Sequence, residues 1–244
     1  MFIFGGCGKK EDLVLRDIAY DESKDNPVIY LKENDEYVPY LVLTSDYNGN
    51  VLLLREYLLP DLQQYKIHES GWTHHEYGSY YETSSIDKFL NSSFYDTLSE
   101  ATKGALVESV IEVTDLESYD EWNYKTHMIS RKVFLLSAVE LGLGDYIEYT
   151  SAKEGNPLKY FKDGESSIRT AYLPDGTEWA YWTRTPHLWE SFLVTVMGVE
   201  ILCNITADTC SGVRPAFCMG KETPIKESAD VIAGEVVYVL DAEN

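Results

Sequence analysis

The first quarter of the chain contains short apolar runs of the kind that form strands. Residues 28–31 and 37–44 make two such runs, and residues 51–54 make a third. Asn48 and Gly49 separate the second run from the third, and both residue types accept the positive φ that a tight hairpin turn requires. The pattern therefore predicts an antiparallel hairpin with these two residues at its turn.

Helical spacing appears further on, beyond a loop of polar and aromatic residues. Ser84 is a suitable N-cap, and apolar residues follow it at the i, i+3 and i+4 positions of one helix face. We therefore expect a helix that begins at Ser84 and extends to Phe94. A second helix is expected over residues 99–112, although its Gly104 is a poor helix former.

The second half of the chain is predicted to be rich in strands. Residues 131–137 are interpreted as a buried strand, followed by a short helical turn over 138–143. Pro174-Asp175-Gly176 predicts a turn between extended segments at 169–173 and 177–184. Further strands are expected at 192–197, 200–205, 213–218 and 235–240.

Strands, then helices, then strands is an order typical of an α+β fold with a mixed or antiparallel sheet. We expect one domain over residues 12–244, preceded by a flexible tether at residues 1–11. The start of the tether, Phe2 to Gly8 followed by two lysines, is similar to the end of a bacterial lipoprotein signal, in which Cys7 becomes lipidated. The alternative is an ordinary tail that contains a cysteine. No apolar run reaches the roughly 18 residues that a membrane helix needs.

Charge excludes two classes of partner. The 244 residues carry 20 Lys and Arg against 41 Asp and Glu, a net charge of −21, and the basic residues do not cluster. Binding to nucleic acid or to an anionic lipid surface requires clustered basic residues, so we expect neither. The 19 tyrosines are typical of surfaces that recognise sugars or proteins, but also of a tyrosine-rich core, and composition leaves both open.

Residue types that carry catalysis or bind metals do not form a recognisable motif. Cys203, Cys210 and Cys218 are three thiols without a CxxC pair, which excludes a structural zinc site of the usual spacing and favours free buried thiols. His68, His74 and the residues beside them are better interpreted as a solvated loop than as metal ligands. No nucleophile elbow or phosphate loop is present. We therefore predict no catalytic residues, metal or cofactor.

Four segments carry a resemblance to a known family: residues 81–95, 132–137, 182–186 (WTRTP) and 212–216 (GVRPA). In this order they resemble an uncharacterised domain family of Gram-positive gut bacteria and their mobile elements, over roughly residues 37–220. Its members resemble C-type-lectin-like domains of the formylglycine-generating-enzyme type. The resemblance implies a mixed or antiparallel sheet with two helices and long loops.

The resemblance also places Arg184 and Arg214 near the sheet that supports the variable loops, where we expect both to act as structural anchors. The calcium motifs of true C-type lectins are absent. The nearest string, Glu121-Trp122-Asn123, lacks a second carboxylate, so no calcium site is implied.

The remaining candidates for ligand binding are Trp179, Tyr181, His187 and Trp189. Alternation along a strand puts Trp179 and Tyr181 on one face and Trp182 on the other, where it is expected in the core. Trp189 is expected on a loop, either as a contact for a sugar or protein or as a buried anchor.

These observations favour a non-enzymatic surface module, extracellular or attached to the cell surface through Cys7, that recognises a glycan or protein through aromatic loops. The alternatives are a thiol-dependent enzyme on a formylglycine-generating-enzyme-like scaffold, which would use Cys203, Cys210 or Cys218, and a structural domain of a virion.

Overall fold

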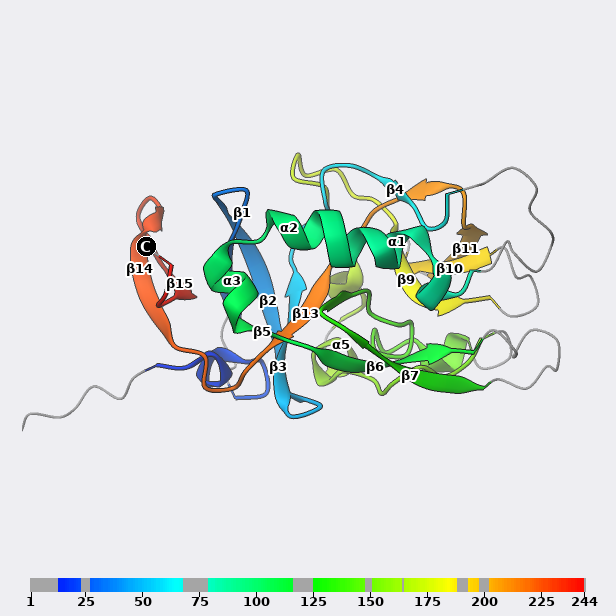
Figure 1. Ribbon diagram of the computed structural model, residues 1–244, viewed down its shortest axis with the longest axis horizontal. Coiled ribbons are helices and arrows are strands. Elements are labelled where there is room, and N and C mark those ends of the chain that lie inside the picture. Colours follow the sequence, from blue (N-terminus) through cyan, green and yellow to red (C-terminus); the bar gives the residue numbers. More distant parts are fainter. Residues whose placement is uncertain are drawn as a thin grey trace, which may run out of the picture.

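A computed structural model of the chain describes residues 13–22, 27–67, 79–115, 125–147, 151–163, 165–187, 193–197 and 202–243. Its main sheet has the strand order β14-β15-β1-β2-β3-β13-β5, and β8 also pairs with β13 (Figure 1). The β1–β15 pair is parallel, and the other pairs in this sheet are antiparallel. The strands of this sheet are β1 (Val28–Glu33), β2 (Glu36–Tyr47), β3 (Asn50–Arg55), β5 (Leu106–Val107), β8 (Val133–Phe134), β13 (Ala216–Met219), β14 (Ile225–Ile232) and β15 (Glu235–Leu240).

The predicted β2–β3 hairpin is confirmed. Asn48 has a φ of 51° and Gly49 a φ of 85°, as a tight turn between right-twisted strands requires. The same chemistry forms a turn that we did not predict, between β1 and β2, where Asn34 and Asp35 have φ values of 48° and 67°. Both turns rest on residues that tolerate the left-handed region: Asn and Gly in the β2–β3 turn, and Asn and Asp in the β1–β2 turn.

A helical segment follows, made of α1 (Ser85–Phe89), the π-helix η3 (Leu90–Phe94) and α2 (Tyr95–Thr97), with α3 (Glu100–Ala105) after it. The Ser84 hydroxyl accepts a hydrogen bond from the Asp87 amide at 3.1 Å, which confirms the predicted N-cap. Ile86, Leu90 and Phe94 belong to this segment, and their side chains are buried in the core.

The predicted second helix is wrong beyond Ala105. The chain turns there into β5 and then β6 (Ser109–Thr114), in which Val110 is exposed and Ile111 is buried. Gly104 is a weak helix former, and the β-branched residues that follow it fit a strand better than a helix. β6 pairs along its whole length with β7 (Thr126–Arg131), a partner that the local pattern does not reveal.

The expectations for the C-terminal half are met in part. The predicted strand at 131–137 shrinks to β8, and the predicted segment at 177–184 becomes a strand only from Tyr181. The turn at 174–176 is confirmed, with Gly176 at a φ of 84°. Two further small sheets are present in the described residues. One contains β9 (Tyr181–Pro186), β10 (Leu193–Met197) and β11 (Leu202–Thr206), and the other pairs β4 (Gln63–Gln64) with β12 (Cys210–Ser211). Short helical turns complete the described chain: η1 (Leu15–Ile18), η2 (Tyr81–Thr83), η4 (Gly144–Tyr146), α5 (Lys159–Asp163) and η5 (Ser166–Arg169).

The core contains much of the aromatic content. Trp182 and Tyr65 are buried with ring centroids 5.3 Å apart, and Tyr40 lies 5.0 Å from Phe217. Tyrosine is therefore a core residue here as well as a surface one, because Tyr146 is 78% exposed. The mixture of helices with a predominantly antiparallel sheet confirms the α+β prediction.

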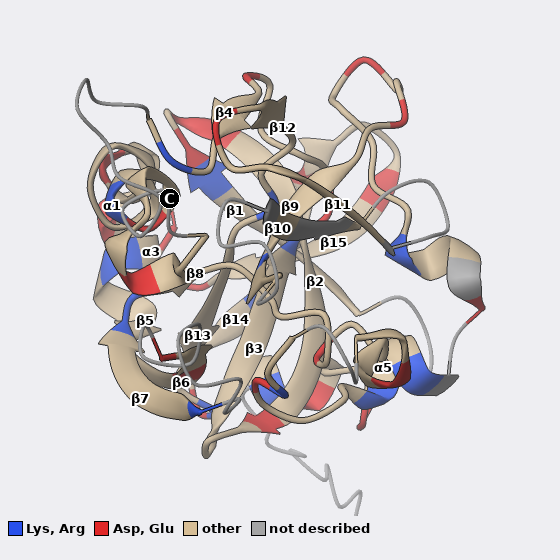
Figure 2. Ribbon diagram, turned by 90° about the vertical axis from the view of Figure 1, so that its right-hand side faces the viewer, with Lys and Arg blue, Asp and Glu red and all other residues tan. Residues whose placement is uncertain are grey.

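In the view of Figure 2, Lys and Arg are dispersed among Asp and Glu over helices, strands and loops. Within the described ranges, none of the helices combines the length and the apolar character needed to cross a membrane.

Candidate functional site

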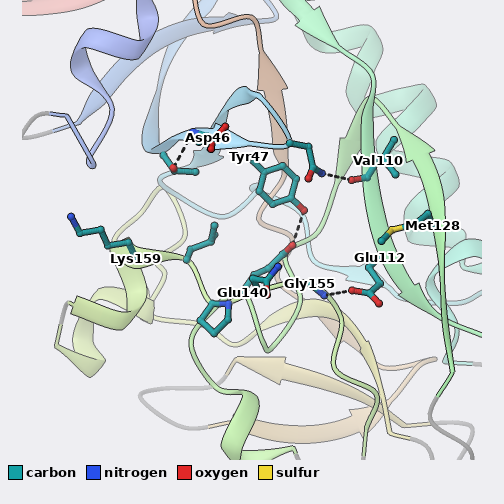
Figure 3. A pocket seen from close by; sticks show the side chains of 13 residues that line it. Asp46, Tyr47, Val110, Glu112, Met128, Glu140, Gly155 and Lys159 are labelled. Carbon is teal, nitrogen blue, oxygen red and sulfur yellow. Dashed lines mark hydrogen bonds between the residues drawn. The ribbon is translucent and has the colours of Figure 1, made fainter.

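An open cleft of about 340 Å³ lies between three segments that are distant in the sequence. These are the β2–β3 turn, the β6–β7 hairpin and the loop before α5 (Figure 3). Its lining residues are Thr44, Asp46, Tyr47, Asn48, Val110, Glu112, Met128, Glu140, Gly155, Asn156, Pro157, Leu158 and Lys159. We refer to it below as the hairpin cleft.

One wall of the hairpin cleft is apolar and open to solvent. Glu112 and Met128 are directly paired across β6 and β7, and Val110 lies two residues from Glu112, so all three share one face of this hairpin. Val110 is 47% exposed and Met128 is 63% exposed. The Asn48 side chain donates a 2.7 Å hydrogen bond to the Val110 carbonyl, which joins the β2–β3 turn to this wall.

The base of the cleft is a buried ion pair. Arg184 and Glu140 are at most 1% exposed, and they form a two-pronged contact, Nη1 to Oε2 at 2.6 Å and Nη2 to Oε1 at 2.8 Å. Glu140 also accepts from the Tyr47 hydroxyl at 2.6 Å and from the Ser137 amide at 3.0 Å. Burial by itself lowers the pKa of Arg184, but the adjacent Glu140 carboxylate raises it overall.

Arg184 also ties together the elements around the cleft. Its Nε donates to the Glu112 carbonyl and its Nη1 to the Leu135 carbonyl, both at 2.9 Å. One side chain on β9 thereby connects β6 to the segment that carries Glu140. Burying a charge is costly unless it is paired and hydrogen-bonded, and these contacts offset that cost.

A second carboxyl, that of Glu154, is buried beside this pair. It accepts from the Thr114 amide and hydroxyl, both at 2.7 Å, and from the Thr185 hydroxyl at 2.8 Å. Burial raises its pKa to about 7, against the opposing effect of the Arg184 charge. Glu154 holds the loop whose next residue, Gly155, lines the cleft.

Gly155 lies close against Glu140 at the base of the cleft. Its φ is +76°, and a Cβ placed on it would lie 2.9 Å from Glu140 Oε1, so a side chain is excluded on both grounds. Its amide donates to Glu112 Oε2 at 2.9 Å, and the Thr126 hydroxyl donates to the other oxygen of the same carboxylate. The cleft is therefore held in shape by hydrogen bonds on each side.

The residues predicted for ligand binding do not line the hairpin cleft. Trp179 is 41% exposed and stays a candidate surface contact, while His187, which follows β9, is half-buried. Tyr181 is only 3% exposed and donates to the Arg169 carbonyl at 2.8 Å, so its expected place on an accessible face is wrong. Trp189 lies outside the described residues, as do Cys7, His68 and His74.

Tyr181 is inaccessible because both faces of β9 are covered by other parts of the chain. All six residues of this strand are buried, so alternation separates two buried sides instead of an inner and an outer one. Trp182, on the other side, donates from its indole to the Gln63 carbonyl at 2.8 Å.

Arg214 lies away from the hairpin cleft. Its Nε donates to the Arg55 carbonyl at 2.9 Å and its Nη2 to the Glu56 carbonyl at 3.1 Å, while the guanidinium lies 5.6 Å from the Tyr181 ring centre. The structure places it, like Arg184, among backbone carbonyls.

The described cysteines are all free thiols, but only Cys218 is buried, because Cys203 is half-buried and Cys210 is exposed. Burial raises the pKa of Cys218 to about 12, which keeps it a neutral thiol at physiological pH. Within the described ranges, no three His, Cys, Asp or Glu side chains gather in a way that could hold a metal ion.

A family model described as a domain of unknown function (DUF6273) matches residues 48–221, well over half of the chain. The chain belongs to the DUF6273 family. This confirms the expected membership of an uncharacterised domain family. β1, β2, β14 and β15 lie outside the match. Of the residues that line the hairpin cleft, Thr44, Asp46 and Tyr47 precede the match and the others fall inside it. Comparison with curated proteins and with solved structures found no match.

Proposed function

We propose that this DUF6273 chain is a non-enzymatic binding domain with a C-type-lectin-like fold, and that its hairpin cleft takes a small glycan. The observation that carries the proposal is the cleft itself: an exposed apolar wall faces polar side chains, over a base fixed by the Arg184–Glu140 pair. Small-ligand sites are concave, largely pre-formed and mixed in polarity in this way.

The chemistry of the lining matches a sugar. The wall of Val110 and Met128 offers apolar contact for the C–H face of a ring. Asp46, Asn156 and Lys159 are exposed at the rim, where carboxylate, amide and ammonium groups can accept from and donate to hydroxyls. Asp46 and Glu112 outnumber the one lysine, since Arg184 neutralises Glu140, so neutral and amino sugars are favoured over acidic ones.

The base of the cleft is occupied by structural hydrogen bonds and offers no spare acid or base. Glu140 accepts four hydrogen bonds, and the Tyr47 hydroxyl is already used as one of their donors. General acid–base catalysis needs a group that can reach the substrate and exchange a proton with it. These contacts therefore favour binding over chemistry, and burial removes Cys218 as a thiolate for the alternative enzyme.

Display at a cell surface, through lipidation of Cys7, stays part of this proposal and rests on the sequence of the tether. Trp179 is 41% exposed outside this cleft and stays a candidate contact for a ligand in its own right. The lectin-like fold rests on the order of the family motifs, together with the predominantly antiparallel sheet.

A glycan array, followed by calorimetric titration of each hit, tests the proposal. Met128→Glu places a charge on the apolar wall, and Val236→Glu makes the same change at a 67% exposed strand position away from the cleft. We expect a neutral or amino glycan to bind, Met128→Glu to weaken binding at least about tenfold, and Val236→Glu to leave it unchanged. An empty array at high protein concentration, or a hit that binds both variants equally well, would contradict the proposal.

A further inference from the structure

The outer strand of the β6–β7 hairpin has an unpaired edge. β7 belongs to a two-stranded sheet, and its six residues pair in unbroken register with those of β6. Within the described ranges no strand pairs with its other side, and β7 lies at the rim of the ribbon in Figure 2. We refer to this outer side of β7 as the free edge.

Contacts made by β6 show which backbone groups point to the free edge. Side chains from other segments bind the carbonyls of Val110 and Glu112 and the amide of Thr114, so the backbone of these residues points away from β7. Residues directly opposite each other in an antiparallel ladder either bond to each other or both point away. The outward-pointing residues of β7 are therefore their partners, Ser130, Met128 and Thr126.

Most of these outward groups are unpartnered. The Ser130 carbonyl accepts from Arg131 Nη1 at 2.9 Å, whereas the other amides and carbonyls of the three residues make no hydrogen bond within the described part of the chain. Met128 is 63% exposed, and Ser130 is exposed as well. A row of unpaired, accessible backbone groups is a template for pairing with another strand.

The free edge also lacks the features that usually prevent such pairing. Proteins protect edge strands with bulges, prolines, lysines or a covering segment. β14, the outer strand of the main sheet, has a register shift between Ser228 and Ile232, and its Ile225 amide donates to the Leu13 carbonyl. β7 contains no bulge, no proline and no lysine. Its backbone is therefore open to a further strand.

From this edge we propose that β7 binds an extended peptide segment of a basic partner protein, which adds to the hairpin as a third, antiparallel strand. Alternate residues of the peptide bond to the backbone of Thr126, Met128 and Ser130. Their side chains lie on the same face as Met128, because directly paired residues share a face. Met128 and Val110 form an exposed apolar wall on this face, so apolar side chains are favoured at these positions.

The intervening side chains of the peptide lie on the opposite face, beside His127, where acids are in excess. The Glu82 carboxylate lies 2.8 Å from His127 Nε2, and the Asp115 carboxylate lies 4.0 Å from Nδ1, so two carboxylates face one imidazole. Arg131 is already paired with Asp87 at 2.8 Å. Lysine or arginine side chains are therefore favoured at the intervening positions.

The charge of the whole chain selects the same kind of partner. Lys125 and Lys132 flank β7, but Lys132 donates to the Tyr95 hydroxyl at 3.0 Å, and the chain as a whole carries a net charge of −21. An acidic peptide is repelled by this charge, and so is a second copy of the chain. A basic peptide with alternating apolar residues fits both the backbone and the charge of the free edge.

A synthetic peptide that alternates lysine with valine over seven residues, with lysine at both ends, tests the proposal by fluorescence anisotropy. The titration is done in about 150 mM salt, which screens long-range attraction to the chain. N-methylation of two valines removes amides that face β7, whereas N-methylation of two inner lysines removes amides that face away. We expect the parent and the lysine-methylated peptide to bind, and the valine-methylated peptide to bind at least about tenfold more weakly. The same peptide with glutamate in place of lysine should not bind.

A proline on the edge provides the matched change in the protein. Ser130→Pro removes an outward amide and places a ring at the free edge, while the ladder to β6 is preserved because this amide does not take part in it. Ser130→Ala keeps the amide and is the control. We expect the proline variant to lose at least about tenfold in peptide affinity and the alanine variant to bind as the wild type does, with similar thermal unfolding of both.

Four results would overturn the assignment, and none involves a glycan, so the test is independent of the function proposed for the hairpin cleft. They are the absence of binding at millimolar peptide, equal binding of the two methylated peptides, equal binding of the glutamate peptide, and binding that survives Ser130→Pro. Sedimentation adds a fifth: a concentration-dependent dimer that Ser130→Pro abolishes would give the free edge to a second copy of the chain instead. If Ser130→Pro fails to fold, the two methylated peptides still decide.

Discussion

The buried carboxyl of Glu154 makes the stability of the protein depend on pH in a direction opposite to that of most carboxylates. Its pKa is raised by burial from the usual 4.5 to about 7. Below pH 4.5 the group is protonated in both the folded and the unfolded chain. Between the two pKa values the unfolded chain releases this proton and the folded chain keeps it. Its contribution to stability is therefore fully present below pH 4.5 and is lost as the pH rises through 7.

The size of the effect follows from the two pKa values. Each pH unit between them is worth about 1.4 kcal/mol, so the proton on Glu154 contributes about 3 kcal/mol at pH 5 relative to pH 8. Glu154→Gln keeps the shape of the protonated side chain and removes the titration. Relative to this variant, the wild type should lose about 3 kcal/mol of unfolding free energy between pH 5 and pH 8.

Urea unfolding at several pH values in this range measures the difference. Subtracting the variant from the wild type cancels other carboxyls, among them Asp87 and Glu56, whose pKa values burial also raises. Glu100→Gln, at a side chain that is 93% exposed, is the control and should follow the wild-type curve. Parallel curves for wild type and Glu154→Gln would refute the reasoning.

Three further predictions rest on single contacts. Arg184→Met leaves the Glu140 carboxylate buried and unpaired, and should lower the free energy of chemical unfolding by about 3–5 kcal/mol. Adding Glu140→Met should recover most of this loss, and a double variant as unstable as Arg184→Met alone would argue against the pair. Gly155→Ala should destabilise by more than Gly176→Ala, because both glycines have a positive φ but a Cβ has space only at Gly176; thermal unfolding that ranks them in reverse would be inconsistent with this packing. Cys210, which is exposed, should react with a maleimide in the folded protein, detected by mass spectrometry of peptides, and its protection would contradict its placement.

The sequence predicts well those features whose causes are local. Asn48-Gly49 forms a hairpin turn because these two residue types accept positive φ, and Ser84 caps a helix through a contact three residues away. The helix expected over 99–112 fails beyond Ala105 because the pairing of β6 with β7 decides that segment. No local pattern contains this pairing.

The hairpin cleft depends on contacts between distant residues, and this is why sequence reasoning missed it. Arg184 stands out in the WTRTP motif, but its partner Glu140 lies 44 residues earlier, in a segment that predicts only a helical turn. Arg55 and Glu33, 22 residues apart, form another buried ion pair, and neither differs in the sequence from an ordinary surface charge. Residue type alone singles out the aromatic candidates, but it does not reveal that both faces of β9 are buried and that Tyr181 is therefore inaccessible.

The Met128 methyl group offers the most direct test of the proposed glycan site. Met128 is 63% exposed on the wall of the hairpin cleft, whereas Met197 and Met219 are fully buried. In protein labelled with ¹³C at the methionine methyl groups, titration with the array-selected glycan should shift the Met128 resonance in a saturable way and leave the resonances of Met197 and Met219 in place. A glycan that binds without moving the Met128 resonance would contradict the assignment of this cleft as the binding site.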